Sequence, residues 1–246
     1  MELSIIIPAY NEEKRLPPTL ERILAHMSKT YAGSYEIIVM DDGSVDGTSQ
    51  SVEPFIKKYP NVRLIRRAQN KGRGVTVREG VGIANGDIVL ETDADGSVDE
   101  EAIPRFVEYL KSHPQVDMLI GSRNIEGSRI LKSQPMIRTV LGHIFFMLAY
   151  VLFGWDFRDR VNGFKMFRRA VANDIFPHQR EIGFLGEAEV VVIAEQRKWK
   201  YELLPVSWSD HRDSRIRPLK ESWRSFWGMI DIVRRRNKGV YDKNVS

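Results

Sequence analysis

Short apolar runs alternate with helical patterns along the first half of the chain, and this alternation most constrains the fold. The strand-like runs occupy residues 3–7, 35–40, 62–65, 86–91 and 118–120, and segments with apolar residues at helical spacing lie between them. Strands that alternate with helices form βαβ units with right-handed crossovers. The sequence therefore predicts an α/β fold with a mostly parallel sheet flanked by helices.

The composition is that of a folded protein. The chain has 246 residues, of which 42% are hydrophobic and 28% charged, which is enough to bury a sizeable core and argues against wholesale disorder. It contains no cysteine, which excludes disulfides, thiolate metal sites and a cysteine nucleophile. Because a strand-like run begins almost directly after Met1, we expect no signal peptide.

Two aspartates follow the strand-like run 86–91, in the sequence Asp93-Ala94-Asp95. Carboxylates at i and i+2 repel each other unless a divalent cation lies between them and a phosphate. Mg²⁺ and similar hard cations prefer oxygen ligands and bind through one or two carboxylates plus substrate phosphates. The pattern favours a site for a metal-chelated nucleoside diphosphate. The alternative is a polar turn whose aspartates cap the next helix.

Two other predicted strands end in polar residues, Asn11 and Glu12 in one case and Asp41 and Asp42 in the other. Because parallel strands end at the same edge of a sheet, we expect these groups to converge with Asp93 and Asp95. The glycine-rich basic loop 69–74 opens a predicted helix, where backbone amides can approach a phosphate. It lacks the spacing of a Walker A loop.

The C-terminal half contains an apolar stretch and a basic tail. Residues 139–155 carry no Asp, Glu, Lys or Arg, but these 17 residues are fewer than the roughly 20 that a spanning helix needs. We expect them to form a core helix, a helix in the membrane interface or the lining of a lipid groove. Residues 212–243 hold ten Lys or Arg against four Asp or Glu, on a helical pattern with two tryptophans. This predicts binding to a membrane surface or docking onto the domain, and the helical spacing of the aromatic residues disfavours nucleic acid.

Six motifs, in order over residues 3–217, resemble the family-2 glycosyltransferases with a GT-A fold, of the dolichyl-phosphate mannose or glucose synthase type. They are Ile7-Pro8-Ala9-Tyr10-Asn11-Glu12, Asp41-Asp42-Gly43-Ser44-Val45-Asp46-Gly47-Thr48, Asn70-Lys71-Gly72-Arg73-Gly74, Asp93-Ala94-Asp95, Gly121-Ser122-Arg123 and Asn162-Gly163-Phe164-Lys165-Met166-Phe167. The resemblance implies a GT-A domain over residues 1–217, and the helical spacing of the aromatic residues predicts a basic amphipathic C-terminal helix and tail over 218–246.

The resemblance also implies roles for individual residues. The groups implied to bind the nucleotide-sugar donor are Pro8, Tyr10, Glu12, Asp42, Lys71, Asp93, Ala94 and Asp95. Those implied to face the acceptor phosphate are Arg123, Lys165, Ser214 and Arg215. The catalytic set is Asp93, Asp95, Arg123, Glu187 and Arg215, with Asp93 and Asp95 on the metal, and with Glu187 and Glu189 as an acidic pair near the donor sugar.

The implied reaction is transfer of a hexose, with inversion, from UDP-glucose or GDP-mannose to a polyprenyl or dolichyl phosphate. Mg²⁺ or Mn²⁺ is the implied cofactor, and the expected location is the cytoplasmic face of a membrane. Gly96-Ser97 resembles the glucosyl branch, while Asn162, Arg215 and the missing transmembrane tail depart from the usual pattern. Two alternatives remain: a glycosyltransferase with a hydroxyl acceptor and Glu187 as base, and a binding scaffold without catalysis.

Overall fold

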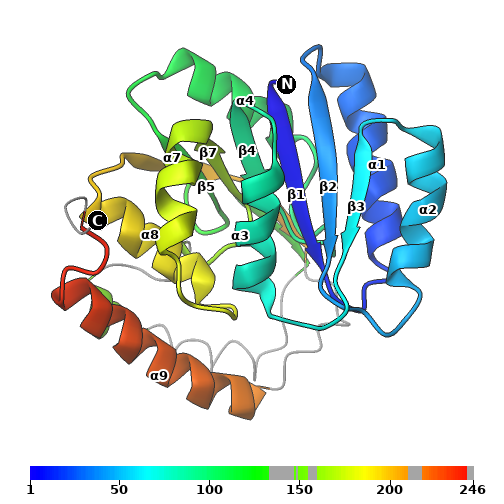
Figure 1. The fold of residues 1–246 in the computed structure, drawn as a ribbon. Helices are drawn as coiled ribbons and strands as arrows, with labels where there is room; N and C mark the ends of the chain where they lie inside the picture. Colours follow the sequence, from blue (N-terminus) through cyan, green and yellow to red (C-terminus); the bar gives the residue numbers. More distant parts are fainter. Residues whose placement is uncertain (133–146, 148, 155–159, 210–217, 243–246) are drawn as a thin grey trace.

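The computed structural model describes residues 1–132, 147, 149–154, 160–209 and 218–242, and its centre is a seven-stranded sheet (Figure 1). In spatial order its strands are β3 (Val62–Arg66), β2 (Tyr35–Asp41), β1 (Leu3–Ala9), β4 (Ile88–Glu91), β7 (Lys165–Arg168), β5 (Met118–Ser122) and β8 (Tyr201–Pro205). A separate pair consists of β6 (Arg129–Lys132) and β9 (Ser207–Ser209).

Helices cover both faces of the sheet, which gives three layers (Figure 1). They are α1 (Leu16–Thr30), α2 (Thr48–Lys58), α3 (Arg73–Ile83), α4 (Ala102–Ser112), α7 (Arg169–Ile175), the 3₁₀ turn η1 (Phe176–His178), α8 (Gly186–Gln196) and α9 (Pro218–Asn237). Alternate residues of β1 point to opposite faces, so Ile5 and Ile7 pack with α1, α2 and α4. Ile6 packs in the other core with α3, α7 and α8, and α9 covers the outer side of α8.

The sheet is parallel apart from one strand. β1 pairs in parallel with β2 and β4, β2 with β3, and β5 with β8, as the alternation of strands and helices predicts. β7 runs antiparallel between β4 and β5. It therefore begins at the edge where its two neighbours end, and its first residue, Lys165, lies opposite Glu91 of β4. This strand brings a lysine to the carboxyl edge of the sheet.

The boundaries of the predicted strands shift by one or two residues in the structure. Pro8 was expected to end the first strand, yet β1 continues to Ala9. Pro8 is tolerated because β4 pairs only with residues 3–6 of β1, so the missing amide of Pro8 falls beyond that ladder. The helix after β4 starts at Ala102, whose amide donates a hydrogen bond to the Asp99 carboxylate. β8 forms one edge of the sheet.

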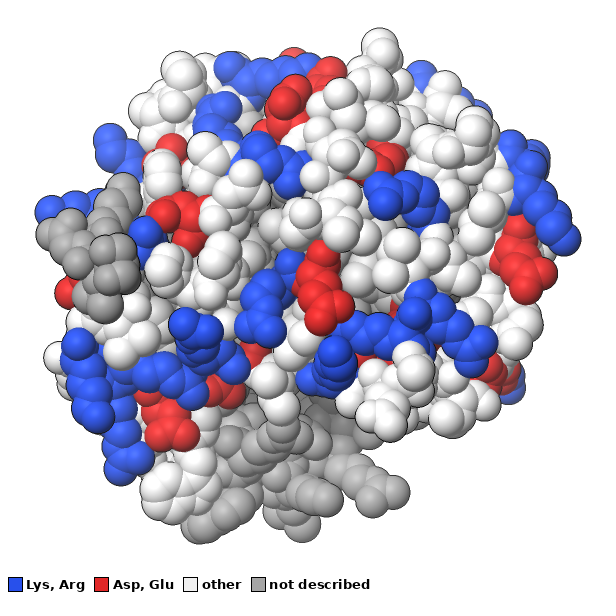
Figure 2. Space-filling view, in the orientation of Figure 1, with Lys and Arg blue, Asp and Glu red and all other residues white. Residues whose placement is uncertain are grey.

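The apolar stretch 139–155 lies mostly outside the described residues. In its described part, Ala149 and Phe153 are buried in the core, while Met147, Tyr150 and Val151 are 58–75% exposed. The predicted amphipathic C-terminal helix is present as α9. None of the described helices is both long and apolar enough to cross a membrane. On the face shown in Figure 2, lysine and arginine side chains gather toward the lower edge, over α9 and the ends of the strands.

Candidate active site

The carboxyl ends of β1, β2 and β4 meet at one edge and bring acidic side chains together. The register pairs Ala9 of β1 with Asp41 of β2, and Ile6 of β1 with Glu91 of β4. β2 and β3 lie on one side of β1 and β4 lies on the other, so the strand order reverses at β1. Open α/β sheets bind ligands at such a switch point. The predicted convergence of the three strand ends is confirmed.

Asp42, at the end of β2, holds the basic loop in place. Its carboxylate accepts hydrogen bonds from the amides of Lys71 (2.9 Å) and Gly72 (2.8 Å), and from the guanidinium of Arg67 (2.7 Å). Gly72 has φ +96°, a conformation that L side chains rarely adopt. Asp42 therefore fixes the loop that precedes α3, and its implied contact with the nucleoside stays a prediction. The Lys71 side chain is exposed at this edge.

Arg73, the first residue of α3, reaches Asp93 beyond β4. Its Nη2 lies 2.8 Å and its Nε 3.3 Å from Oδ1 of Asp93. The backbone of Gly163 packs against this pair, because a Cβ at Gly163 would overlap the Asp93 carboxylate and lie 2.6 Å from Nη2 of Arg73. The glycine of the Asn162-Gly163 motif is thus required by a close approach to the first aspartate. Ala94 is 4% exposed and anchors the turn between the two aspartates.

Asp95 and Glu12 complete a cluster of acidic groups with Asp93. Burial raises the pKa of Asp95, and the neighbouring charge of Asp93 raises it further. Burial also raises the pKa of Glu12; the bond and charge of Arg15 oppose this, and the charges of Asp95 and Asp93 add to it. Each raised pKa means that the ionised carboxylate is less stable here than in water when no ligand is bound. A cation bound here would relieve that cost.

The residues at this edge fit a divalent cation that binds together with a substrate. Asp93 and Asp95 offer carboxylate oxygens, the ligands that Mg²⁺ and Mn²⁺ accept. Asp95 accepts a hydrogen bond from the amide of Ser97 at 3.0 Å through one oxygen, Oδ1. Within the described ranges, no group of three or more His, Cys, Asp or Glu is arranged to hold an ion. A cation held by two carboxylates would complete its coordination with phosphate oxygens and water.

A buried charge network adjoins this cluster. The Lys165 ammonium donates to Glu187 and to the carbonyl of Asn162, and it lies 3.7 Å from the Glu91 carboxylate. Glu187 stands in the first turn of α8, and its other oxygen pairs with Arg73. Lys165 is 0% exposed, and burial lowers its pKa to about 8. Both oxygens of Glu187 are thus paired with cations.

The network changes the interpretation of two predicted residues. Lys165 is enclosed by protein groups and its ammonium pairs with Glu187, so its role in the structure is to position that carboxylate. Its contact with an acceptor phosphate stays a prediction. Glu189 was expected beside Glu187 near the donor sugar. Its distance from the sugar stays a prediction. In the structure the buried Glu189 carboxylate accepts hydrogen bonds from Arg235, from Tyr241 and from the backbone amides of residues 180 and 181.

Sequence reasoning missed Arg73 and Glu91 as site residues. Arg73 was part of a recognised basic loop, but only the fold brings its guanidinium to Asp93. Glu91 ends a buried apolar strand, and a charged residue in such a run was a usable signal. Burial raises the pKa of Glu91, and its Oε1 has no hydrogen-bond partner within the described part of the chain.

The remaining predicted residues lie around this edge or outside the described residues. Arg123 follows β5, and its guanidinium stacks over the ring of Trp208 at 4.6 Å. Tyr10 is 46% exposed just past β1, and Pro8 is half-buried in that strand. Ser214 and Arg215 lie outside the described residues, so the structure does not place them.

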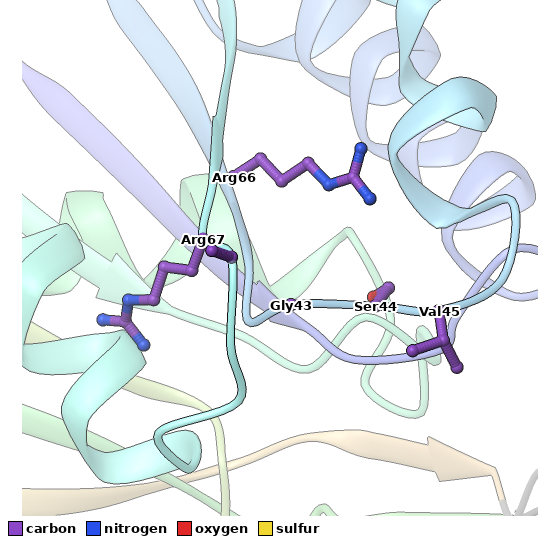
Figure 3. Close-up of a pocket in the computed structure, with 6 residues that line it drawn as sticks. Gly43, Ser44, Val45, Arg66 and Arg67 are labelled. Carbon is purple, nitrogen blue, oxygen red and sulfur yellow. The ribbon is translucent and has the colours of Figure 1, made fainter.

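A hollow of about 560 Å³ opens beside the acidic loop after β2 (Figure 3). It is lined by Gly43, Ser44 and Val45 from that loop and by residues 66–68, at and after the end of β3. Figure 3 shows the side chains of Arg66 and Arg67 pointing in opposite directions from adjacent positions. Arg67 points toward Asp42, whereas Arg66 is half-exposed and lies 3.9 Å from Asp41. The hollow adjoins the loop that holds the predicted nucleoside-binding Asp42.

The chain is similar to known proteins over most of its length. It is 32% identical over 222 residues to a dolichyl-phosphate beta-glucosyltransferase of Trichomonas vaginalis, covering 87% of this chain and 66% of that protein. It is 31% identical over 241 residues to the dolichyl-phosphate beta-glucosyltransferase of Homo sapiens, covering 94% and 72%. The chain thus spans about two thirds to three quarters of the length of these relatives.

A solved structure shares the fold. Glucosyl-3-phosphoglycerate synthase from Mycobacterium tuberculosis, in complex with Mn²⁺, UDP-glucose and phosphoglyceric acid, aligns with a TM-score of 0.72 at 15% identity. The alignment covers 94% of this chain and 79% of that one. The sequence profile described as "Glycosyl transferase family 2" matches residues 4–176. The chain therefore belongs to glycosyl transferase family 2.

Proposed function

We propose that this chain transfers glucose from UDP-glucose to a dolichyl or related polyprenyl phosphate. The observation that carries the proposal is the likeness, at 31–32% identity over most of the chain, to proteins named dolichyl-phosphate beta-glucosyltransferases. The same relatives favour glucose, and nothing supports the mannosyl alternative. The acidic groups at the switch-point edge could bind a nucleoside diphosphate through a divalent cation held between them and its phosphates.

The pairing of both Glu187 oxygens with cationic side chains supports a phosphate acceptor over a hydroxyl acceptor. A hydroxyl must lose its proton to a nearby base as it attacks, and Glu187 was the candidate base. Both of its oxygens are instead paired, one with Arg73 and the other with Lys165. A phosphate monoester oxygen is already anionic near neutral pH and needs no such base. The structure thus fits an acceptor that brings its own charged nucleophile.

In the proposed reaction, an acceptor phosphate oxygen attacks the anomeric carbon of glucose from the side opposite the diphosphate. The new carbon–oxygen bond forms as the bond to the diphosphate breaks, and UDP leaves with the electron pair. Because attack and departure occur on opposite sides, the configuration at the anomeric carbon inverts. Asp93 and Asp95 would hold Mg²⁺ or Mn²⁺, which neutralises charge on the leaving diphosphate. Arg73 is placed beside Asp93 to add positive charge there. Arg123, Ser214 and Arg215 are proposed to receive the acceptor phosphate.

A lipid acceptor calls for a membrane surface, and we propose peripheral binding to the cytoplasmic face. The apolar side chains of Met147, Tyr150 and Val151 are exposed together on one short segment. Trp227 of α9 is 45% exposed, and three arginines stand in the last turn of that helix. Aromatic and basic side chains on one helix favour the interface of an anionic bilayer.

A transfer assay tests the proposal. The protein is mixed with Mn²⁺, a short dolichyl phosphate and labelled UDP-glucose, GDP-mannose or UDP-N-acetylglucosamine in separate reactions. We expect label in the organic phase with UDP-glucose alone. Label with GDP-mannose alone would overturn the donor, and release of UDP without labelled lipid would overturn the acceptor.

A paired substitution tests the metal site in the same assay. Asp95→Ala should abolish transfer while the far-UV circular dichroism spectrum stays that of the wild type. Asp87→Asn is the control, because Asp87 is exposed and directly precedes β4, at the end of that strand away from Asp95. Full activity in the Asp95 variant would contradict the role of this residue at the metal.

A further inference from the structure

The carboxylate of Glu189 is fully buried and accepts four hydrogen bonds from two distant parts of the chain. Its Oε2 accepts from the backbone amides of Arg180 (2.7 Å) and Glu181 (2.6 Å), which precede α8. Its Oε1 accepts from Nη1 of Arg235 (2.7 Å) and from the hydroxyl of Tyr241 (2.6 Å), both near the C-terminus. Four hydrogen bonds compensate the cost of burying this charge. Because the bonds in such a network strengthen one another, loss of any one donor weakens the remaining bonds.

On one side, Glu189 fixes the turn 180–182, which presses against the basic loop of the donor site. The amide of Gly74 donates to the carbonyl of Ile182 at 2.9 Å. A Cβ at Gly72 would overlap the carbonyl oxygen of Ile182, and one at Gly74 would overlap that of Glu181. The turn is thus in backbone contact with both neighbours of Arg73. The position of Arg73 beside Asp93 depends on this packing.

On the other side, Glu189 anchors the C-terminal segment. Arg235 of α9 also pairs with Glu181 at 2.9 Å, so it holds both the carboxylate and the turn. Tyr241 is 0% exposed, and the charge of Glu189, added to burial, raises its pKa above the ordinary tyrosine value. Nη1 of Arg197 donates to the carbonyls of Tyr241 and Asp242, each at 3.1 Å. Glu189 and Arg197 therefore each hold the C-terminal segment against α8.

Glu189 stands two residues after Glu187, so one turn of α8 serves both networks. Glu187 pairs with Arg73 in the donor site, and Glu189 pairs with Arg235 and Tyr241. α9 begins at Pro218, directly after residues 210–217, which contain the predicted acceptor-binding Ser214 and Arg215. The first turn of α8 and the turn 180–182 therefore join the donor site to the element that follows the predicted acceptor segment.

We propose that Glu189 is a positioning residue that couples docking of the C-terminal segment to the placement of Arg73 and Glu187 in the donor site. When Arg235 and Tyr241 are bound, the turn 180–182 holds the basic loop in the shape that presents Arg73 to the diphosphate. When they are released, Glu189 loses half of its donors and the turn loosens. The effect on donor binding rests on the proposed function, whereas the coupling itself concerns the protein alone.

The test uses Tyr241→Phe, which removes one hydroxyl from Glu189 and keeps the aromatic ring in the core. Tyr201→Phe is the matched control, because the Tyr201 hydroxyl bonds to Glu195 near the other end of α8 at 2.8 Å. Glu189→Gln is the stronger variant, since an amide cannot accept all four bonds. Arg235→Lys and Arg235→Met form a further pair, in which lysine keeps the charge and should retain part of the coupling.

Two readouts separate the coupling from the activity. Hydrogen exchange of the ligand-free protein reports on the amides of residues 72–76 and 180–182, and we expect at least tenfold faster exchange there in Tyr241→Phe and not in Tyr201→Phe. Calorimetric titration with UDP and Mn²⁺ should show at least fivefold weaker binding in the first variant, with binding within twofold of wild type in the control.

Unchanged exchange in Tyr241→Phe and Glu189→Gln would overturn the coupling, whatever the enzyme activity. A lower melting temperature with unchanged hydrogen exchange at residues 72–76 and 180–182 would also overturn it, because the residue would then act on stability alone. Faster exchange in a protein whose wild type binds no UDP would uphold the coupling and refute the proposed donor. The two failures are therefore distinguishable.

Discussion

Removal of the Lys165 ammonium should destabilise the protein far more than loss of an exposed charge. Lys165 is 0% exposed, donates to Glu187 and to the Asn162 carbonyl, and lies 3.7 Å from Glu91. Lys165→Met keeps most of the side-chain volume, so the change removes the charge with little cavity formation. The buried carboxylates then lose their main counter-ion.

The expected loss of unfolding free energy depends on the carboxylates that stay buried after the lysine is removed. Removal of one partner of a buried ion pair costs about 3–5 kcal/mol. We expect about 3 kcal/mol, at the low end of that range, because Arg73 continues to pair with Glu187. Glu91 carries much of the cost, since it is 1% exposed and its Oε1 accepts no hydrogen bond from the described residues. Adding Glu91→Gln to Lys165→Met should therefore recover about 1–2 kcal/mol.

Urea unfolding followed by circular dichroism measures these differences. With a slope of about 3 kcal/mol per M, the midpoint of Lys165→Met should fall by about 1 M. Lys200→Met is the control, because Lys200 is exposed, and its effect should stay below about 0.5 kcal/mol. A loss below about 1 kcal/mol for Lys165→Met would refute the reasoning, since that is the contribution of an exposed pair.

Three further predictions follow from the same geometry. Burial lowers the pKa of Lys165 to about 8, so the ammonium loses its proton as the pH rises through that value. We expect kcat/KM to fall above about pH 8 and the fall to move to higher pH in Lys165→Arg, because a guanidinium stays protonated; identical alkaline limbs would count against this. Gly72→Ala should raise the KM for the donor at least tenfold, because φ is +96° and the Cβ meets a carbonyl, whereas Gly82→Ala, with open space around it, should leave KM unchanged. Equal KM values in steady-state assays of the two variants would contradict the role of the loop. Ile232→Ala should lower the free energy of unfolding by about 2–4 kcal/mol, because this fully buried side chain docks α9, and urea titration showing less than about 1 kcal/mol would mean that α9 contributes little.

The sequence alone determined the order of the strands and helices and the positions of the acidic groups. Strand and helix patterns are local, because each depends on the spacing of apolar side chains over a few residues. Parallel strands end at one edge, so the sequence alone places Glu12, Asp42, Asp93 and Asp95 together. The antiparallel direction of β7 was beyond this rule, because it depends on how the chain returns to the sheet.

Only the tertiary structure decided which charges meet. Arg73 and Asp93 are 20 residues apart, and Lys165 and Glu187 are 22 apart, so no local pattern pairs them. The contrast between Glu187 and Glu189 shows this most clearly. Two glutamates in one helical turn look equivalent in the sequence, yet one joins the donor-site network and the other anchors the C-terminal segment. Their roles differ because helical geometry points them in different directions and long-range packing places different partners there.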